Sequence, residues 1–271
     1  MGFLEDQIRR TERREAWEKV RTAVIIIVVA GVILVALASF FSYSKDTSVT
    51  VVYVEGELST GDFFGNGATG SEYVGRLVRD AADNPLVEAI VLRVNSPGGT
   101  PAAAQEIITD IEYAKERKPV VISMGDIATS AAYAISAHGD RIYANPDTIT
   151  AGIGTIWTFT DISRWLENEG LNVTVVKSGS RKDMASPYRP ITGEEISYAQ
   201  DIVDASSERL ITDIAAARNV SRSLIEDGRI LRGEDAIRYG LVDELGNLHT
   251  AIDGARNLAS LPRSSAGDRL S

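Results

Sequence analysis

The longest apolar run in the chain lies close to its N-terminus. Residues 23–41 read AVIIIVVAGVILVALASFF and contain no charged side chain. As a helix, this run would span about 28 Å, close to the thickness of the hydrocarbon core of a bilayer. Arginine and lysine cluster before the run, whereas only Lys45 follows it closely. The pattern predicts a cytoplasmic juxtamembrane segment over residues 1–22, a single-pass anchor in the cell membrane over residues 23–43, and a domain outside the cytoplasm.

A cleaved signal peptide is the alternative interpretation of this run, because Ala36-Leu37-Ala38 resembles a cleavage site. However, more than twenty residues precede the run, and the run exceeds the roughly 7–15 apolar residues of a signal peptide. We therefore expect an uncleaved anchor.

After the anchor, short β-branched runs alternate with stretches of helical spacing. Strands are predicted at Ser48–Val54, Ala89–Leu92, Val120–Met124, Arg141–Ala144, Gly152–Trp157 and Val173–Lys177. Helices are predicted at residues 72–82, 100–117, from about Ser130, after Asp161, and at 193–218. Residues 56–70, rich in Gly, Ser and Thr, are predicted to form a loop. The alternation predicts an α/β fold of repeated βαβ units over residues 44–260, followed by a flexible tail over residues 261–271.

Composition narrows the possible functions. The chain has no cysteine, which excludes disulfides, thiolate metal sites and cysteine nucleophiles. Its net charge is −10, and the acidic excess lies beyond the basic N-terminal segment. Such a surface repels phosphate backbones, so we expect no nucleic-acid partner.

Two predicted strand-to-helix connections contain residues suited to acyl-transfer chemistry. The first, Val94–Thr100, includes Gly98 and Gly99, whose uncovered backbone N–H groups could stabilise an oxyanion. The second ends at Ser130, which stands where a helix should begin and is followed by Ala131 and Ala132. A tight glycine turn and a plain helix N-cap are the structural alternatives. The occurrence of both features at strand ends of neighbouring units favours a site.

A serine nucleophile needs a base. His138 lies eight residues after Ser130 on the same predicted helix, about 12 Å along its axis, and nothing ties His249 to the site. A lysine whose pKa is lowered by partial burial is the other possibility. The segment Val176–Asp183 contains two candidates, Lys177 and Lys182, and spacing alone does not choose between them.

Four ordered motifs, NSPGG, GDIATSAAY, KSGSRKDMASPYRPIT and GRILRGEDAIRYGLVDELG, resemble the signal peptide peptidase A family of serine proteases. The resemblance covers about residues 51–258 and implies a ClpP/crotonase-like fold. It implies Ser130 as the nucleophile, Lys182 as the general base, and the amides of Gly99 and Ala131 as oxyanion donors, with Gly98 beside them in the substrate-binding loop.

The resemblance also implies the remaining expectations. The substrates would be apolar peptides near the membrane, such as remnant signal peptides or membrane-protein segments, with no cofactor and no metal. This chain matches the half-length family members, which resemble homo-oligomeric rings whose sites combine serine and lysine from neighbouring subunits. Many members have Gly-Gly after the serine, so Ala131-Ala132 indicates a changed specificity. A non-catalytic membrane-bound scaffold and a crotonase-like acyl-CoA hydratase or hydrolase are the alternative functions.

Overall fold

The computed structural model describes residue 2, residues 17–36 and residues 48–261. The chain divides into two compact units, Met1–Ser48 and Val49–Ser271, and each is described by itself. Residues 1 and 3–16 of the predicted cytoplasmic segment, the end of the predicted anchor at residues 37–43, and the tail at residues 262–271 lie outside the described residues.

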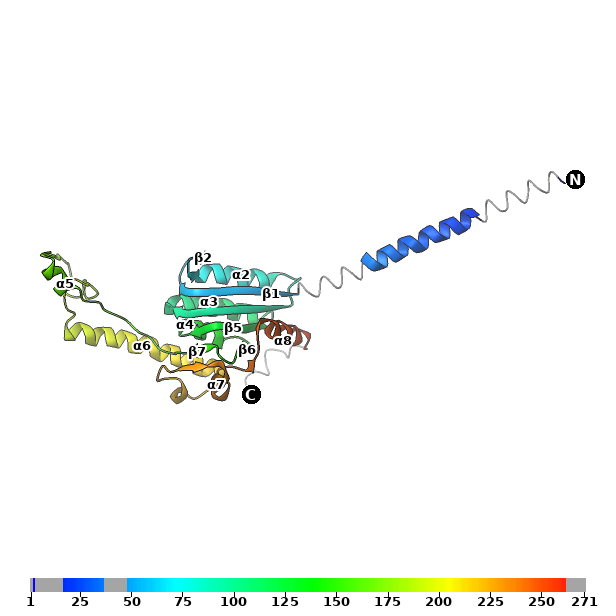
Figure 1. Ribbon diagram of the computed structural model, residues 1–271. Coiled ribbons are helices and arrows are strands. Elements are labelled where there is room, and N and C mark those ends of the chain that lie inside the picture. The colour runs from blue at the N-terminus through cyan, green and yellow to red at the C-terminus, as the bar shows by residue number, and fades with distance from the viewer. Residues whose placement is uncertain (1, 3–16, 37–47, 262–271) are drawn as a thin grey trace. The chain divides into compact units, whose positions relative to one another are not determined.

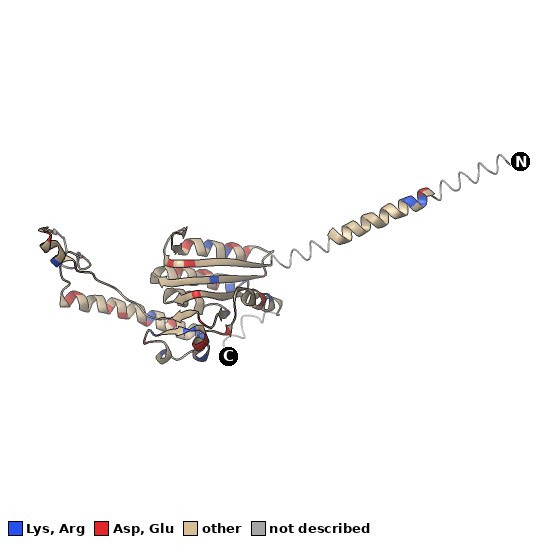
Figure 2. Ribbon diagram, viewed as in Figure 1, with Lys and Arg blue, Asp and Glu red and all other residues tan. Residues whose placement is uncertain are grey.

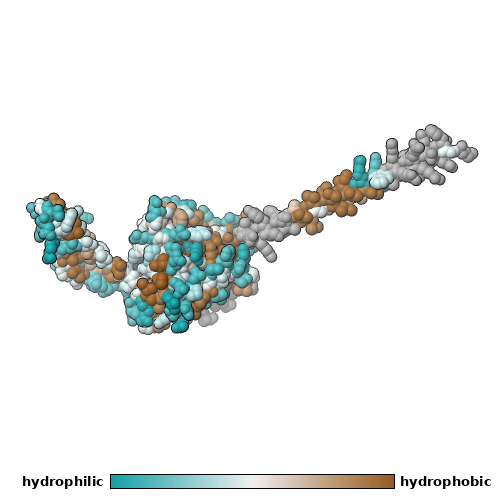
Figure 3. Space-filling view, viewed as in Figure 1, coloured by the Kyte–Doolittle hydropathy of each residue, from teal (hydrophilic) through white to brown (hydrophobic). Residues whose placement is uncertain are grey.

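Among the described residues of the first unit, the helix Trp17–Ala36 is long and apolar enough to cross a membrane. Figure 2 shows charged residues only at its N-terminal end, and Figure 3 shows that the rest of its visible surface is mostly hydrophobic. No residue of the helix is buried. A helix that is apolar on all sides is typical of a membrane span. The helix begins six residues before the predicted anchor.

The second unit is built on one mixed, mostly parallel sheet (Figure 1), as the α/β prediction required. The strands are β1 (Val49–Ser59), β2 (Phe64–Gly65), β3 (Ala68–Gly70), β4 (Ala89–Gly99), β5 (Val120–Thr129), β6 (Arg141–Ala144), β7 (Ile149–Ala151), β8 (Ile230–Arg232) and β9 (Glu244–Leu245). The main order is β2-β3-β1-β4-β5-β6-β9, while β7 pairs with the end of β5 and with β8. Only the β2–β3 and β7–β8 pairs are antiparallel among the described strands.

Helices cover both faces of the sheet. The described helices of the unit are α2 (Ser71–Asp83), α3 (Pro101–Lys115), α4 (Ala131–Ala137), α5 (Ser163–Asn168), α6 (Gly193–Arg218), α7 (Gly233–Ala236) and α8 (Leu248–Ser260), with 3-10 turns η1 (Arg222–Leu224) and η2 (Ile237–Tyr239). The larger core cluster joins one face of the sheet to α2, α3 and α4. A smaller cluster, which includes Val91, Val121 and Ala255, joins the other face to α8.

Several predicted elements require correction. The predicted loop at residues 56–70 contains the end of β1 and the short strands β2 and β3. The predicted strand Gly152–Trp157 is wrong, since β7 ends at Ala151. The predicted strand Val173–Lys177 is also wrong: no described strand pairs with it, and Val176 is 94% exposed. β-branched residues alone do not make a strand where the backbone finds no partner.

A protruding arm completes the unit. α5 and the N-terminal part of α6 extend away from the sheet, with residues 169–192 connecting them (Figure 1). α6 begins with a capping box, in which Thr192 and Glu195 bond each other's backbone N–H groups. It ends at Asn219, whose left-handed conformation (φ 52°) stops the helix. Residues 193–218 thus match the predicted helix, and its C-terminal part returns to the sheet beside α4.

Candidate active site

Ser130 lies at the junction between β5 and α4, at the end of a central strand. Its backbone has φ 54° and ψ −124°, a conformation that residues with a side chain rarely adopt. The strained turn is fixed on both sides, because the Ser130 N–H donates to the Ala151 carbonyl (2.9 Å) and the Ser130 carbonyl accepts from Ala134 (2.9 Å). The Ser130 side chain makes no capping hydrogen bond to the helix. The plain N-cap interpretation therefore does not explain this serine.

Gly98 allows β4 to approach the serine turn. A Cβ atom on Gly98 would lie 2.9 Å from the Ser130 Cβ and 2.9 Å from the Thr129 carbonyl oxygen. Thr129 binds the same loop, because its hydroxyl donates to the Pro97 carbonyl at 2.9 Å. On the other side of β4, a Cβ atom on Gly99 would overlap the Leu58 carbonyl. Gly98 thus permits close packing against the serine turn, and Gly99 permits close packing against β1.

The backbone N–H groups near Ser130 differ in whether they already donate a hydrogen bond. Ala131 is the first residue of α4, so its N–H has no acceptor within the helix. The Gly98 N–H donates to the Ser96 hydroxyl at 3.1 Å. Of the predicted oxyanion donors near Ser130, Ala131 thus has an N–H without an acceptor in its helix, whereas the N–H of the neighbouring Gly98 is already bonded. Gly99 lines the cavity described next.

A cavity of about 540 Å³ opens beside Ser130. Its walls come from the starts of α3 and α4, from residues 154–156 and from one face of α6. Most of the wall is apolar, with Ala104, Ile108, Ala134 and Leu210 among its members. A mostly apolar pocket with a few polar groups is typical of a substrate site.

Contacts near the start of α4 and at its end hold this helix in place beside the cavity. The Tyr133 hydroxyl donates to the Leu241 carbonyl at 2.9 Å, and burial raises the pKa of Tyr133 well above its usual range. At the other end of α4, His138 lies between Glu112 and Asp213, with 2.9 Å contacts to each. Burial acts to raise the pKa of Glu112, but the bonds from His138 and Lys115 outweigh it, so its pKa lies below the ordinary value. His138 does not line the cavity, so it is a structural link between α3, α4 and α6.

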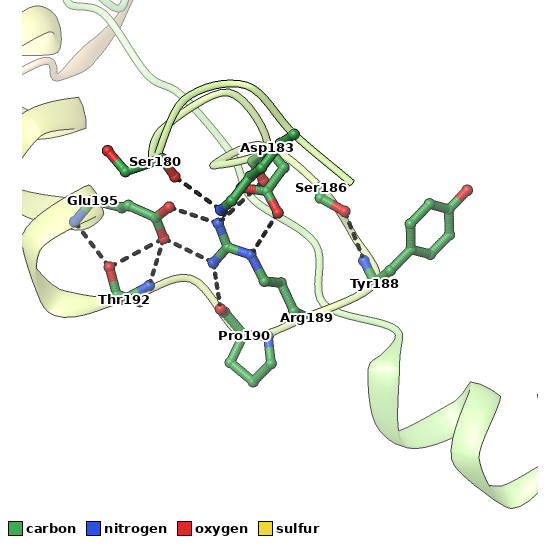
Figure 4. A network of polar contacts seen from close by, with 9 residues as sticks. Ser180, Asp183, Ser186, Tyr188, Arg189, Pro190, Thr192 and Glu195 are labelled. Atoms are coloured by element: carbon green, nitrogen blue, oxygen red, sulfur yellow. Dashed lines mark hydrogen bonds and ion pairs between the residues drawn. The ribbon is translucent and has the colours of Figure 1, made fainter. Parts of the chain in front are cut away.

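Lys177 and Lys182 lie on the arm in different surroundings (Figure 4 shows this region). Lys177 donates to Asp183 (2.5 Å) and to the Ser180 carbonyl (2.9 Å). Arg189 bridges Asp183 and Glu195 with charge-assisted bonds of 2.6–3.0 Å. We call Lys177, Asp183, Arg189 and Glu195 the ion-pair cluster.

The ion-pair cluster keeps its two carboxylates charged. Hydrogen bonds from Arg189, and then from Lys177, hold the pKa of Asp183 far below its usual range. Arg189 and the Thr192 backbone lower the pKa of Glu195 to about 2. Lys182, by contrast, has no ion pair or side-chain hydrogen bond with any described residue, and it is exposed. Of the two candidate lysines, only Lys182 is therefore unengaged within the described part of the chain.

The structure does not bring Lys182 to Ser130 within one chain. The lysine loop is attached to the first turn of α6, where Arg181 pairs with Glu194 at 2.5 Å. Ser206, the first α6 residue lining the cavity, lies twelve residues further on, about 18 Å along the helix axis. Lys182 is not among the residues that line the cavity.

The sequence did not point to the α6 wall of the cavity. Ser206, Arg209, Leu210 and Asp213 share one helical face, and their i, i+3, i+4, i+7 spacing is the signal that could have identified it. Within the described residues, no group of three or more His, Asp or Glu side chains forms a candidate metal site.

Comparison with known proteins finds a peptidase family and several proteins named as proteases or peptidases. The model of peptidase family S49 matches residues 112–262. A protein of Methanocaldococcus jannaschii named as a protease is 34% identical over 194 residues, 70% of this chain and 62% of the relative. A Synechocystis protein named as a protease is 38% identical over 176 residues, 64% of each chain. An Enterococcus faecium protein named for the signal peptide peptidase SppA is 33% identical over 178 residues, 64% of this chain and 52% of the relative.

These relatives and the α/β fold define the class as peptidases. The chain belongs to peptidase family S49, which confirms the resemblance drawn from its motifs. It spans less than two thirds of the length of each of these relatives.

Proposed function

We propose that this protein is a membrane-anchored serine endopeptidase with a Ser–Lys dyad. The observation that carries the proposal is the strained Ser130 turn, where a serine whose hydroxyl bonds no described residue lies beside a helix-start amide and an apolar cavity. Strained conformations of non-glycine residues persist where function requires them. A sharp strand-to-helix turn exposes a nucleophilic serine in other hydrolases too.

In this proposal, the Ser130 hydroxyl attacks the carbonyl carbon of the scissile bond. Lys182, acting as a neutral amine, takes the serine proton and passes it to the leaving amine as the C–N bond breaks. The amides of Ala131 and Gly99 bind the oxyanion. Water then attacks the acyl ester of Ser130, which releases the second peptide fragment and restores the hydroxyl.

The choice of Lys182 as the base rests on the contacts of the arm. A lysine bound to a carboxylate is stabilised in its charged form and is a poor base. Lys177 is bound in this way to Asp183. Arg189 also binds Asp183, so this carboxylate already has two cationic partners. Lys182, its neighbour in sequence, does not pair with it.

We further propose that Lys182 acts on Ser130 of a neighbouring copy of the chain. The attachment of the lysine loop far from the cavity along α6 supports this arrangement. The arm and its connection also expose large apolar side chains, with Ile156 89% and Val176 94% exposed. Exposed apolar surface of this kind is typical of an interface. A homo-oligomeric ring would place Lys182 of one copy beside Ser130 of the next, and it would also cover the exposed apolar side chains.

The apolar helix Trp17–Ala36 supports anchoring in a membrane, with the N-terminus cytoplasmic and the peptidase unit outside. Apolar peptides close to that membrane, such as remnant signal peptides, fit the apolar cavity. The peptidase relatives favour this function over an acyl-CoA enzyme.

The test measures hydrolysis of an apolar fluorogenic peptide by the full chain in detergent micelles. Ser130→Ala and Lys182→Ala should each remove nearly all turnover, whereas the matched substitution Lys177→Ala should retain more than Lys182→Ala. If the wild type is inactive while assembled, or if Ser130→Ala keeps its activity, the function is wrong.

Mixing the two inactive variants tests the shared site. In random 1:1 assemblies, one site in four receives an intact serine and an intact lysine, so about a quarter of wild-type activity should return. A dyad formed within one chain predicts no activity in the mixture, and that outcome would refute the shared arrangement alone.

A further inference from the structure

Arg209 is an unpaired cation in the wall of the Ser130 cavity. It lies on α6 and lines the cavity together with Ser130, Ala131 and Ala134. Its guanidinium offers five N–H donors, and none of them has a hydrogen-bond or ion-pair partner among the described residues. Most arginines of the described peptidase unit pair with a carboxylate, so this free side chain stands out.

Both acidic neighbours of Arg209 on α6 are engaged elsewhere. Glu208 accepts two bonds of 2.5 Å from Arg222. Asp213 lies four residues after Arg209, the spacing at which helix ion pairs form. Asp213 instead contacts the Nε2 atom of His138 at 2.9 Å. Neither carboxylate is bonded to Arg209, although Asp213 lines the same cavity.

The surroundings of Arg209 favour an anionic ligand. Arg209 is itself exposed, and the cavity lining beside it includes the apolar Ile108, Ala134 and Leu210 as well as Asp213. A guanidinium without a protein partner can donate charge-assisted hydrogen bonds to an anionic group that enters the cavity. Planar guanidinium groups bind carboxylates with two parallel bonds.

We infer that Arg209 binds a carboxylate of the substrate, so the enzyme prefers apolar peptides that carry one acidic group near the cleaved bond. This inference rests on the proposed peptidase function, and it adds a charge requirement to the apolar preference. The carboxylate can come from an acidic side chain or from the C-terminus of a short peptide. Both sources present the same chemistry to Arg209, and the substrates below distinguish them.

The test uses the full chain in detergent micelles and a matched series of apolar fluorogenic peptides. Each peptide carries Glu, Gln or Lys at one position flanking the cleaved bond and ends in either a free carboxylate or an amide. At one position, kcat/KM for Glu should exceed that for Gln by on the order of tenfold. If the C-terminus is the source, the acid form should exceed the amide form by a similar factor instead.

Arg209→Gln should reduce this ratio to about one, and Arg209→Glu should reverse it in favour of Lys. Arg238→Gln is the matched control, because it removes the same charge from an exposed position (72%) outside the cavity. It should leave the ratio unchanged. Equal rates for all peptides, or a ratio that survives Arg209→Gln, would overturn the inference.

Binding separates this inference from the proposed catalysis. Ser130→Ala, which cannot form the acyl ester, should bind the preferred acidic peptide more tightly than its neutral partner in fluorescence anisotropy. Adding Arg209→Gln to this variant should abolish the difference. If no hydrolysis is found but the Arg209-dependent binding persists, the carboxylate site stands and the peptidase function fails. If Ser130-dependent hydrolysis is found without any Arg209 effect, the peptidase function stands and the carboxylate site fails.

Discussion

Replacing Gly98 by alanine tests whether the close approach of β4 sets the position of Ser130, the proposed nucleophile. The added Cβ would lie 2.9 Å from the Ser130 Cβ, 2.9 Å from the Thr129 carbonyl and 3.1 Å from the Ala131 nitrogen. Unbonded carbon atoms approach favourably only to about 3.5–4.0 Å. The serine turn or β4 must therefore move by roughly 0.6–1 Å to admit the methyl group.

A displacement of this size should affect catalysis strongly. Misplacing a catalytic group by about 1 Å costs roughly a hundredfold in rate. We expect kcat of Gly98→Ala to fall by about this factor, because the substitution moves Ser130 relative to the Ala131 amide. An alanine at the positive φ of Gly98 (110°) also carries backbone strain, which should lower the free energy of unfolding by about 1–3 kcal/mol.

Gly65→Ala is the control for Gly98→Ala, because it introduces backbone strain without the steric clash. Gly65 has a similar φ (121°), but an added Cβ would meet no atom within 4 Å. Both variants should lose stability in thermal unfolding, whereas only Gly98→Ala should lose peptide hydrolysis. If kcat of Gly98→Ala stays within threefold of that of Gly65→Ala, β4 does not position the serine in the way we describe.

Two further predictions concern the strained turn and the arm. Ser130→Gly should be more stable than Ser130→Ala by about 1–3 kcal/mol, because glycine adopts the Ser130 conformation without strain; equal unfolding midpoints would contradict this. The folded pKa of Glu195 (about 2) lies below its ordinary value of 4.5, so its contribution to stability is present above pH 4.5 and is lost as the pH falls towards 2. Hydrogen exchange of residues 177–195, corrected for intrinsic rates, should therefore rise in this acid range, whereas Arg189→Gln should exchange rapidly already at pH 7. Protection in Arg189→Gln equal to that of the wild type would show that the ion-pair cluster does not hold the loop.

The central elements of the fold could be predicted from local pattern. Buried β-branched runs predict the cores of β4 and β5, and Thr100 caps α3 through the Ala103 N–H, as its position before Pro101 indicates. The strands continue beyond the predicted ends for a reason that only the folded chain supplies. The Asn95 side-chain oxygen accepts from the N–H groups of Asp126 and Ile127, where the register of β4 and β5 shifts. A polar side chain thus satisfies backbone donors at a point that looks like a loop in sequence.

On the arm, the local pattern predicts a strand that does not form. Val173–Lys177 has strand composition but no described partner strand, so its apolar side chains stay exposed in the single chain. The sequence alone also leaves Lys177 and Lys182 equivalent, since both are lysines of one short segment. Their difference depends on which of them reaches Asp183, and that depends on how Arg189 and Glu195 fold the loop onto α6.

The same dependence on tertiary pairing applies to the cavity. Arg209 and Asp213 have the spacing of an ordinary helix ion pair, and sequence reasoning would assign them to each other. Asp213 instead contacts His138, which ends the helix whose N-cap is Ser130. Arg209 is thereby left without an ion-pair partner among the described residues. The charge that the proposed site would present to a substrate thus depends in part on a residue that does not line the cavity.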